Sequence, residues 1–239
     1  MKKILMSFML VFTLTSVSNA QALLILLFGD KLSTETFQMG INGSLSASNI
    51  NGIDNTNYRI SWAFGAFGEI RLSDDWFMHF NLTIKTPGGA KNVGPLVPVP
   101  PEVDTLLTAF KVTRSLNYIT LPVFLKYKIG SVKLGVGAQL GYLTSADDTY
   151  ESITPMGNDL TVVTNIRDKL NHWDAGVTGI IDYFFSPEKN MRSLRLSLTY
   201  YYGLTDMLKD NTGNAWNNSI FLLSIGIPVG GSGGENTKD

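Results

Sequence analysis

The chain contains no cysteine and only 2 histidines among its 239 residues. Without cysteine it can form neither a disulfide framework nor a thiolate metal site, and it cannot carry a lipid anchor on an N-terminal cysteine. Charged residues make up only 16% of the chain, compared with about 25% in an average soluble domain. The 19 Lys and Arg nearly balance the 20 Asp and Glu, so the sequence offers no basic surface that would bind nucleic acid.

Long apolar runs are also missing, apart from one at the N-terminus. Lys2 and Lys3 precede this apolar run, and the small residues Ser-Asn-Ala, which end at Ala20, follow it. This order is typical of a secretory signal peptide, and the run is shorter than the ~20 residues that a membrane helix needs. We therefore expect a signal peptide over 1–20, followed over 21–35 by a periplasmic N-terminal segment that could form a short helix.

From residue 36 the hydrophobic pattern alternates with a period of 2, which predicts strands and not helices. Val132 and Leu134 share one face of a run, for example, while Lys133 and Gly135 share the other. We expect eight such strands, each about a dozen residues long, over 36–47, 58–72, 76–86, 116–128, 131–143, 172–185, 192–203 and 216–229.

The connections between these strands alternate in length. Short turns fall near 73–75, 129–131 and 186–191, and longer loops near 48–57, 87–115, 144–171 and 204–215. Short turns on one side and long loops on the other are typical of outer-membrane barrels. The sequence therefore predicts an all-β fold, an eight-stranded antiparallel transmembrane up-and-down β-barrel over 36–229, with long outer loops, short periplasmic turns and a flexible tail over 230–239.

Charge decides which face of the predicted strands meets lipid. Placing a Lys or Arg in the middle of the bilayer costs roughly 2–4 kcal/mol, so the face that carries the cations must point into the lumen. There we expect a structural network of ion pairs, with a charge-lined conduction path as the alternative. The predicted lumen charges are Arg59, Arg71, Lys85, Lys126, Lys133 and Arg195 with Glu69, Asp174 and Asp182.

Aromatic residues gather at the ends of the apolar face, as in the interfacial belts of membrane barrels. A soluble periplasmic ligand-binding barrel is the structural alternative, but its strands would usually be only about 5–6 residues long. The expected periplasmic belt contains Trp76, Tyr127, Tyr183 and Phe185, and the expected outer belt contains Tyr58, Tyr142, Trp173, Tyr202 and Trp216.

One predicted strand carries a family motif. Residues 118–127, Tyr-Ile-Thr-Leu-Pro-Val-Phe-Leu-Lys-Tyr, resemble the recurrent Y-x-x-(I/L)-P-x-x-(L/F)-K-Y strand of the PorT-type outer-membrane β-barrels of Bacteroidetes. Segments 22–31, 174–176, 202–206 and 225–228 are also similar to this family. The resemblance covers nearly all of the mature chain and implies an outer-membrane barrel.

The founding member of that family is tied to type IX secretion, but the resemblance assigns no role to any residue of this chain. One feature departs from many outer-membrane barrels. The last predicted strand ends at Pro228-Val229 instead of at an aromatic residue.

Residues that could support catalysis are few. We expect His79 to be a hydrogen-bonded lumen residue. The acidic pairs at 74–75 and 147–148 lack the spacing of a calcium loop, and no serine-hydrolase, phosphate-binding or zinc motif occurs. His172 is the one candidate for an outer-rim hydrolase, together with nearby carboxylates. Those carboxylates are Asp174, Asp147, Asp148 and Glu151.

Taken together, these features predict an integral protein of the cell outer membrane without enzymatic activity. We assign no catalytic, cofactor-binding or metal residue, and expect no cofactor. The expected partners are outer-membrane lipid and, through the outer loops, envelope or secretion proteins. The alternatives are a hydrolase that uses His172 and the loop carboxylates, and the soluble ligand-binding barrel.

Overall fold

The strands account for nearly all regular structure in the computed structural model, which describes residues 36–97, 110–153, 159–186, 193–210 and 213–229. A short 3-10 turn, η2, lies at Arg167–Lys169. No helix in these ranges is long and apolar enough to cross a membrane. The strands are β1 (Phe37–Asn51), β2 (Asn57–Arg71), β3 (Trp76–Lys91), β4 (Phe110–Ile129), β5 (Val132–Ile153), β6 (Asp159–Asn165), β7 (Trp173–Phe184), β8 (Arg195–Gly203) and β9 (Asn217–Val229).

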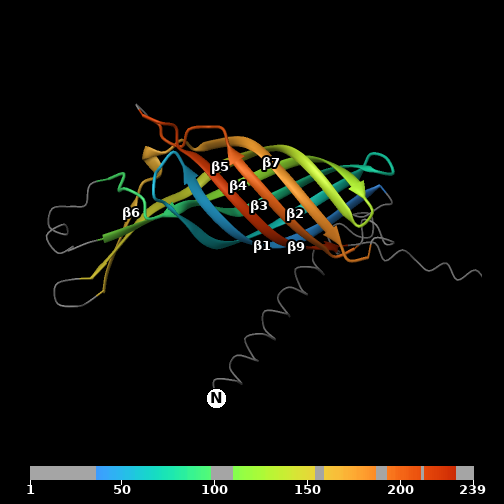
Figure 1. The fold of residues 1–239 in the computed structure, drawn as a ribbon, viewed down its shortest axis with the longest axis horizontal. Helices are drawn as coiled ribbons and strands as arrows, with labels where there is room; N and C mark the ends of the chain where they lie inside the picture. The colour runs from blue at the N-terminus through green and yellow to red at the C-terminus, as the bar shows by residue number, and fades with distance from the viewer. Residues whose placement is uncertain (1–35, 98–109, 154–158, 187–192, 211–212, 230–239) are drawn as a thin grey trace, which may run out of the picture.

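These strands form one antiparallel sheet that closes on itself. β1 pairs with both β2 and β9, and β4 pairs with both β3 and β5, so the succession of hydrogen-bonded neighbours returns to its start. Of the nine strands, all except β6 belong to this ring, and β6 pairs with β5. Figure 1 shows the ring as tilted strands around a common axis. The predicted eight-stranded antiparallel barrel is therefore confirmed.

The two faces of each strand differ as predicted. In β4, Ile119, Leu121 and Leu125 are 41%, 45% and 46% exposed, whereas Thr120 and Lys126, at alternate positions, are buried. Exposed large apolar side chains continue over every strand of the ring, so the outer wall is apolar and the interior polar. Such a wall is far larger than the apolar patches that soluble monomers expose. The soluble ligand-binding barrel, which puts its apolar face inside, is therefore wrong.

Aromatic pairs occur at both ends of this wall. The ring centroids of Trp76 and Tyr127 lie 5.0 Å apart at the short-turn end, and those of Tyr142 and Trp173 lie 5.1 Å apart toward the long loops. Trp216 does not belong to the outer belt, because it packs against a buried apolar cluster and lies 5.3 Å from the guanidinium of Arg114.

Three strands continue well past the predicted ends. β3, β4 and β5 contain 16, 20 and 22 residues, so much of the predicted loops 87–115 and 144–171 is strand. A β-bulge explains why the hydrophobic alternation did not predict this continuation. The pairing of β4 with β5 shifts register between Asn117 and Tyr118, and the buried positions of β5 change from odd, at Leu143, to even, at Ala146.

A second irregularity corrects the position of Lys85, which the alternation assigned to the lumen. The register between β2 and β3 shifts where Phe64 pairs with Lys85. Lys85 then lies over the ring of Trp62, with Nζ 4.1 Å from the centroid, and Trp62 is 58% exposed on the outer wall. The prediction for Lys85 is therefore wrong, because a bulge can re-aim a side chain to the other face.

Several expectations concern residues outside the described ranges. They are the signal peptide over 1–20, the periplasmic segment over 21–35 and the flexible tail over 230–239.

Candidate functional site

The lumen contains a buried cluster of charges centred on Glu69 of β2. Lys126 of β4, Lys133 of β5 and Arg195 of β8 place side-chain nitrogens 3.4, 2.5 and 3.1 Å from its carboxylate oxygens. All these side chains are at most 5% exposed. One carboxylate therefore links four strands of the ring, β2, β4, β5 and β8.

Two further side chains complete this lumen cluster. Asp182 of β7 accepts a hydrogen bond from Lys126 at 2.5 Å, and His79 Nδ1 lies 3.5 Å from Glu69 Oε2. The predicted lumen histidine and five of the predicted lumen charges are thus placed inside. Three buried cations, Lys126, Lys133 and Arg195, face two carboxylates, which leaves one positive charge in excess among these five side chains.

Aromatic faces offset part of this excess. Lys133 Nζ lies 3.4 Å from the ring centroid of Phe77 and 4.6 Å from that of Phe184. The guanidinium of Arg195 lies 3.5 Å from the ring centroid of Phe67. Cations are attracted to the negative face of an aromatic ring, most strongly where water is excluded. The cluster therefore forms a packed cross-link inside the barrel.

A small polar cavity lies beside the lumen cluster. It has a volume of about 20 Å³ and is lined in part by Asn42, Asn81 and Arg195. The side-chain oxygens of both asparagines and Nη2 of Arg195 are buried and have no hydrogen-bond partner within the described part of the chain. A polar cavity needs only about 10–15 Å³ to hold a water molecule, so this site suits an ordered water.

The other predicted lumen charges lie apart from the cluster. Asp174 accepts hydrogen bonds from Thr205 at 2.7 Å and from Asn218 at 2.8 Å. Arg59 donates to a backbone carbonyl, and Arg71 pairs at 2.6 Å with Asp74, whose side chain is 93% exposed at the short-turn end.

Beyond the aromatic belt, the outer parts of β3, β4 and β5 form an extension together with β6 and η2. Its interior is an apolar cluster that differs sharply from the polar lumen below. Burial raises the pKa of Tyr150 there, so its hydroxyl stays protonated and donates to the carbonyl of Val97 at 2.9 Å. The cluster consists of Ile50, Ala90, Val93, Val112, Leu116, Tyr118, Leu143, Ala146, Tyr150, Ile166, Leu170 and Met207.

One ion pair is buried in this outer extension. Arg114 of β4 donates to both carboxylate oxygens of Asp148 of β5, at 2.8 and 2.7 Å, and both side chains are 0% exposed. This pair was not predicted from the sequence, although Val112, Arg114 and Leu116 continue the inward positions of β4. That parity was the signal that could have revealed it.

The residues of the hydrolase hypothesis do not come together. Asp148 is held by Arg114, Asp147 accepts from Asn165 at 3.1 Å on the exposed face, and Glu151 is exposed. The ring of His172 lies 6.2 Å from that of Tyr142, and Nε2 of His172 has no hydrogen-bond partner among the residues that the structure describes. No ion pair joins His172 to a carboxylate in the described ranges, and no group of three or more potential metal ligands occurs there.

This architecture matches a known family of barrel domains. A family model for an outer membrane protein beta-barrel domain matches residues 28–209. No curated protein sequence matches the chain.

Solved barrels resemble the chain at low identity. Ail, the attachment invasion locus protein of Yersinia pestis, is 11% identical, with a TM-score of 0.40 over 82% of this chain and 99% of Ail. Neisserial surface protein A is 13% identical, with a TM-score of 0.36 over 80% and 96% of the two chains. OprG of Pseudomonas aeruginosa is 9% identical, with a TM-score of 0.34 over 82% and 96%.

The family model covers well over half of the chain and seven of the eight strands of the ring, all except β9. The apolar wall, the aromatic residues at both of its ends and the charged interior are those of a barrel whose outer surface meets lipid. The chain belongs to the outer membrane protein beta-barrel domain family and is an integral protein of the outer membrane.

Proposed function

We propose that this protein is a non-enzymatic barrel that presents its outer extension to a protein partner. The length of β4 and β5 is the main observation that supports this proposal. β4 and β5 contain 20 and 22 residues, about twice the 9–11 residues that a transmembrane strand needs. The surplus projects as ordered sheet at the outer end of the barrel. An ordered surface loses little conformational entropy on binding, which favours affinity.

β6 gives this extension an edge suited to an extended peptide. It pairs with β5 on one side, and no described strand pairs with its other side. Its sequence, Asp-Leu-Thr-Val-Val-Thr-Asn, contains neither the proline nor the lysine that often protect edge strands. Addition of a strand to such an edge is a common mode of peptide recognition, in which the backbone supplies the hydrogen bonds.

A photo-crosslinking amino acid in place of Val163 tests this proposal in intact cells. Val163 lies on β6 and is 62% exposed, and Leu45, on the lipid-facing wall of β1, is also 62% exposed and provides a matched control. We expect a discrete protein adduct from position 163 and none from position 45. Equal adducts from both positions, or none from 163, would contradict a partner at the extension.

Substitution of His172 distinguishes this proposal from the hydrolase alternative. Because no carboxylate lies in hydrogen-bonding contact with its ring in the described ranges, we expect His172→Ala to leave crosslinking at 163 and barrel folding unchanged. The cold-SDS mobility of the unboiled protein reports folding. Loss of a hydrolytic activity toward envelope peptides or lipids in this variant would instead support the enzyme.

We propose further that the chain is a PorT-type barrel with an accessory role in secretion. Residues 118–127 support this assignment, because the motif supplies Lys126 of the lumen cluster and Tyr118, whose hydroxyl accepts from Asn218 at 3.0 Å. Comparison of the proteins secreted by a deletion strain and its parent tests the role. An unchanged profile would count against it.

A further inference from the structure

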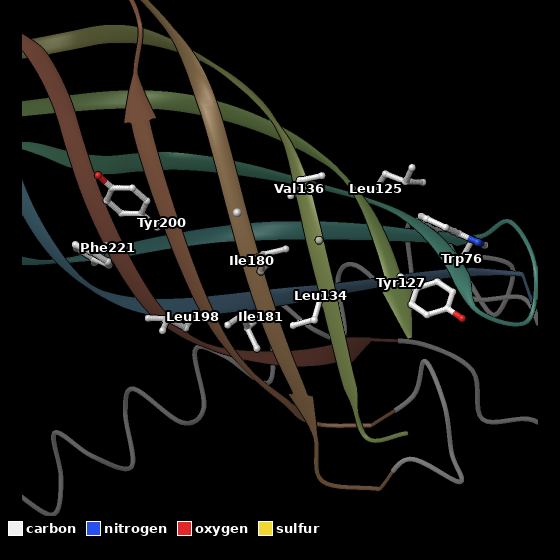
Figure 2. A pocket seen from close by; sticks show the side chains of 12 residues that line it. Trp76, Leu125, Tyr127, Leu134, Val136, Ile180, Ile181, Leu198, Tyr200 and Phe221 are labelled. Carbon is white, nitrogen blue, oxygen red and sulfur yellow. The ribbon is translucent and has the colours of Figure 1, made fainter. Parts of the chain in front are cut away.

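An apolar groove crosses the outer wall of the barrel at its short-turn half, on the outer side of the strand segments that carry the lumen cluster inside, and away from the outer extension. It has a volume of about 490 Å³, which lies in the range of about 300–1,000 Å³ found for ligand pockets. Figure 2 shows its labelled side chains as a band that runs obliquely from Trp76 and Tyr127 to Tyr200 and Phe221.

A glycine on the outer face explains why the convex wall is hollowed there. Gly179 of β7 pairs with Val136 of β5. Among the described residues, a Cβ added at Gly179 would meet one atom within 4 Å, the carbonyl oxygen of Gly135 at 3.9 Å, so there is open space where a side chain would stand. The walls of the groove are Leu134, Val136, Ile181 and Leu198, which are 43%, 73%, 49% and 47% exposed.

Aromatic pairs close both ends of the groove. Trp76 and Tyr127, at the periplasmic belt, have ring centroids 5.0 Å apart, and Tyr200 and Phe221 have centroids 4.5 Å apart. Tyr200 lies five residues beyond Arg195, where β8 begins at its periplasmic end. At about 3.3 Å per residue and about 40° of tilt, this amounts to roughly 12 Å along the barrel axis, about half of the ~25 Å apolar band. The groove therefore spans the periplasmic leaflet.

We propose that this groove is a binding site for one acyl chain of a phospholipid from the periplasmic leaflet. The groove lies within the lipid-facing wall, none of the described residues that line it is charged, and it extends inward from the belt where lipid headgroups begin. An acyl chain has no polar backbone that would need hydrogen bonds in the bilayer. A second barrel is disfavoured as the occupant, because the two convex walls would touch at the ridges beside the groove and leave it unfilled.

Two glycine variants form a matched test. Gly179→Leu places a side chain in the groove, whereas Gly43→Leu places one on the outer face of β1, where an added Cβ meets nothing within 4 Å. Full-length protein purified in detergent would be titrated with dioleoyl phosphatidylethanolamine and examined by native mass spectrometry. We expect the first lipid to bind Gly179→Leu about tenfold more weakly, the effect of losing contact with about two methylenes. Gly43→Leu should bind like the wild type.

Equal lipid binding by both variants would overturn the proposal, as would a wild-type dimer that Gly179→Leu alone dissociates. A wild-type experiment covers the case in which Gly179→Leu fails to fold. A phosphatidylethanolamine with a diazirine in its acyl chain should label Leu134, Ile181 and Leu198 in preference to Leu45 on the opposite wall. Even labelling around the barrel would mean ordinary bilayer contact and would refute a specific site. Neither readout depends on the proposed partner at β6.

Discussion

Glu69→Gln should destabilise the whole barrel by about 3–5 kcal/mol, the usual cost of removing one partner from a buried ion pair. The amide keeps the size of the side chain, so the loss is electrostatic. Lys126, Lys133 and Arg195 would share the single carboxylate of Asp182 in a lumen where none of them is more than 5% exposed. Because the free energy of unfolding of a whole domain is only about 5–15 kcal/mol, this loss would remove a large part of the stability of the barrel.

Urea unfolding of the refolded protein in detergent, followed by tryptophan fluorescence, measures this effect. Asp74→Asn is the control, because it also changes a carboxylate to an amide. Asp74 pairs with Arg71 at the exposed turn, where its side chain is 93% accessible, and such surface pairs contribute only about 0–1 kcal/mol. Similar midpoints for the two variants would show that the lumen cluster does not hold the barrel together.

A second variant identifies the cause of this loss. Lys133→Gln combined with Glu69→Gln removes one cation and one carboxylate, so the excess of positive charge stays at one. We expect the double variant to be more stable than Glu69→Gln alone, by an amount that measures the coupling of the pair. Simple addition of the two single losses would contradict direct coupling between them.

The sequence predicted the inward position of this cluster well, because a period of 2 fixes the face of every residue once one charged residue is placed. Which charges meet was not predictable. Arg195 and Glu69 are 126 positions apart in the chain and become neighbours only when the ring closes with a particular stagger of its strands. Local alternation carries no information about that stagger.

Bulges explain the other wrong predictions. Lys85 was assigned to the wrong face because one irregular pairing inverts the alternation that follows it. The outer half of β5 was assigned to a loop for the same reason. β6 contains several residues that favour strands, but it is only seven residues long, and β5 is its one neighbour among the described strands. β6 pairs with the outer part of β5, which the alternation assigned to a loop, so the alternation offered no reason to predict β6.

Asp148→Asn should melt the outer extension while the barrel stays closed. The change leaves the guanidinium of Arg114 without its bidentate carboxylate in an apolar cluster, again at a cost of about 3–5 kcal/mol. The lumen cluster lies outside this apolar cluster and is untouched. We therefore expect faster hydrogen exchange in the outer segments of β4 and β5 and in β6, together with an unchanged cold-SDS mobility of the unboiled protein.

The neighbouring carboxylate is the control for this prediction. Asp147→Asn makes the same chemical change one residue away, but Asp147 faces outward, where its side chain accepts a hydrogen bond from Asn165. Its exchange pattern should match the wild type. If both variants exchange alike, the buried pair does not hold the extension. If Asp148→Asn also abolishes the cold-SDS shift, the extension and the barrel form one cooperative unit, and the extension would then be part of the barrel's stability instead of a separable binding platform.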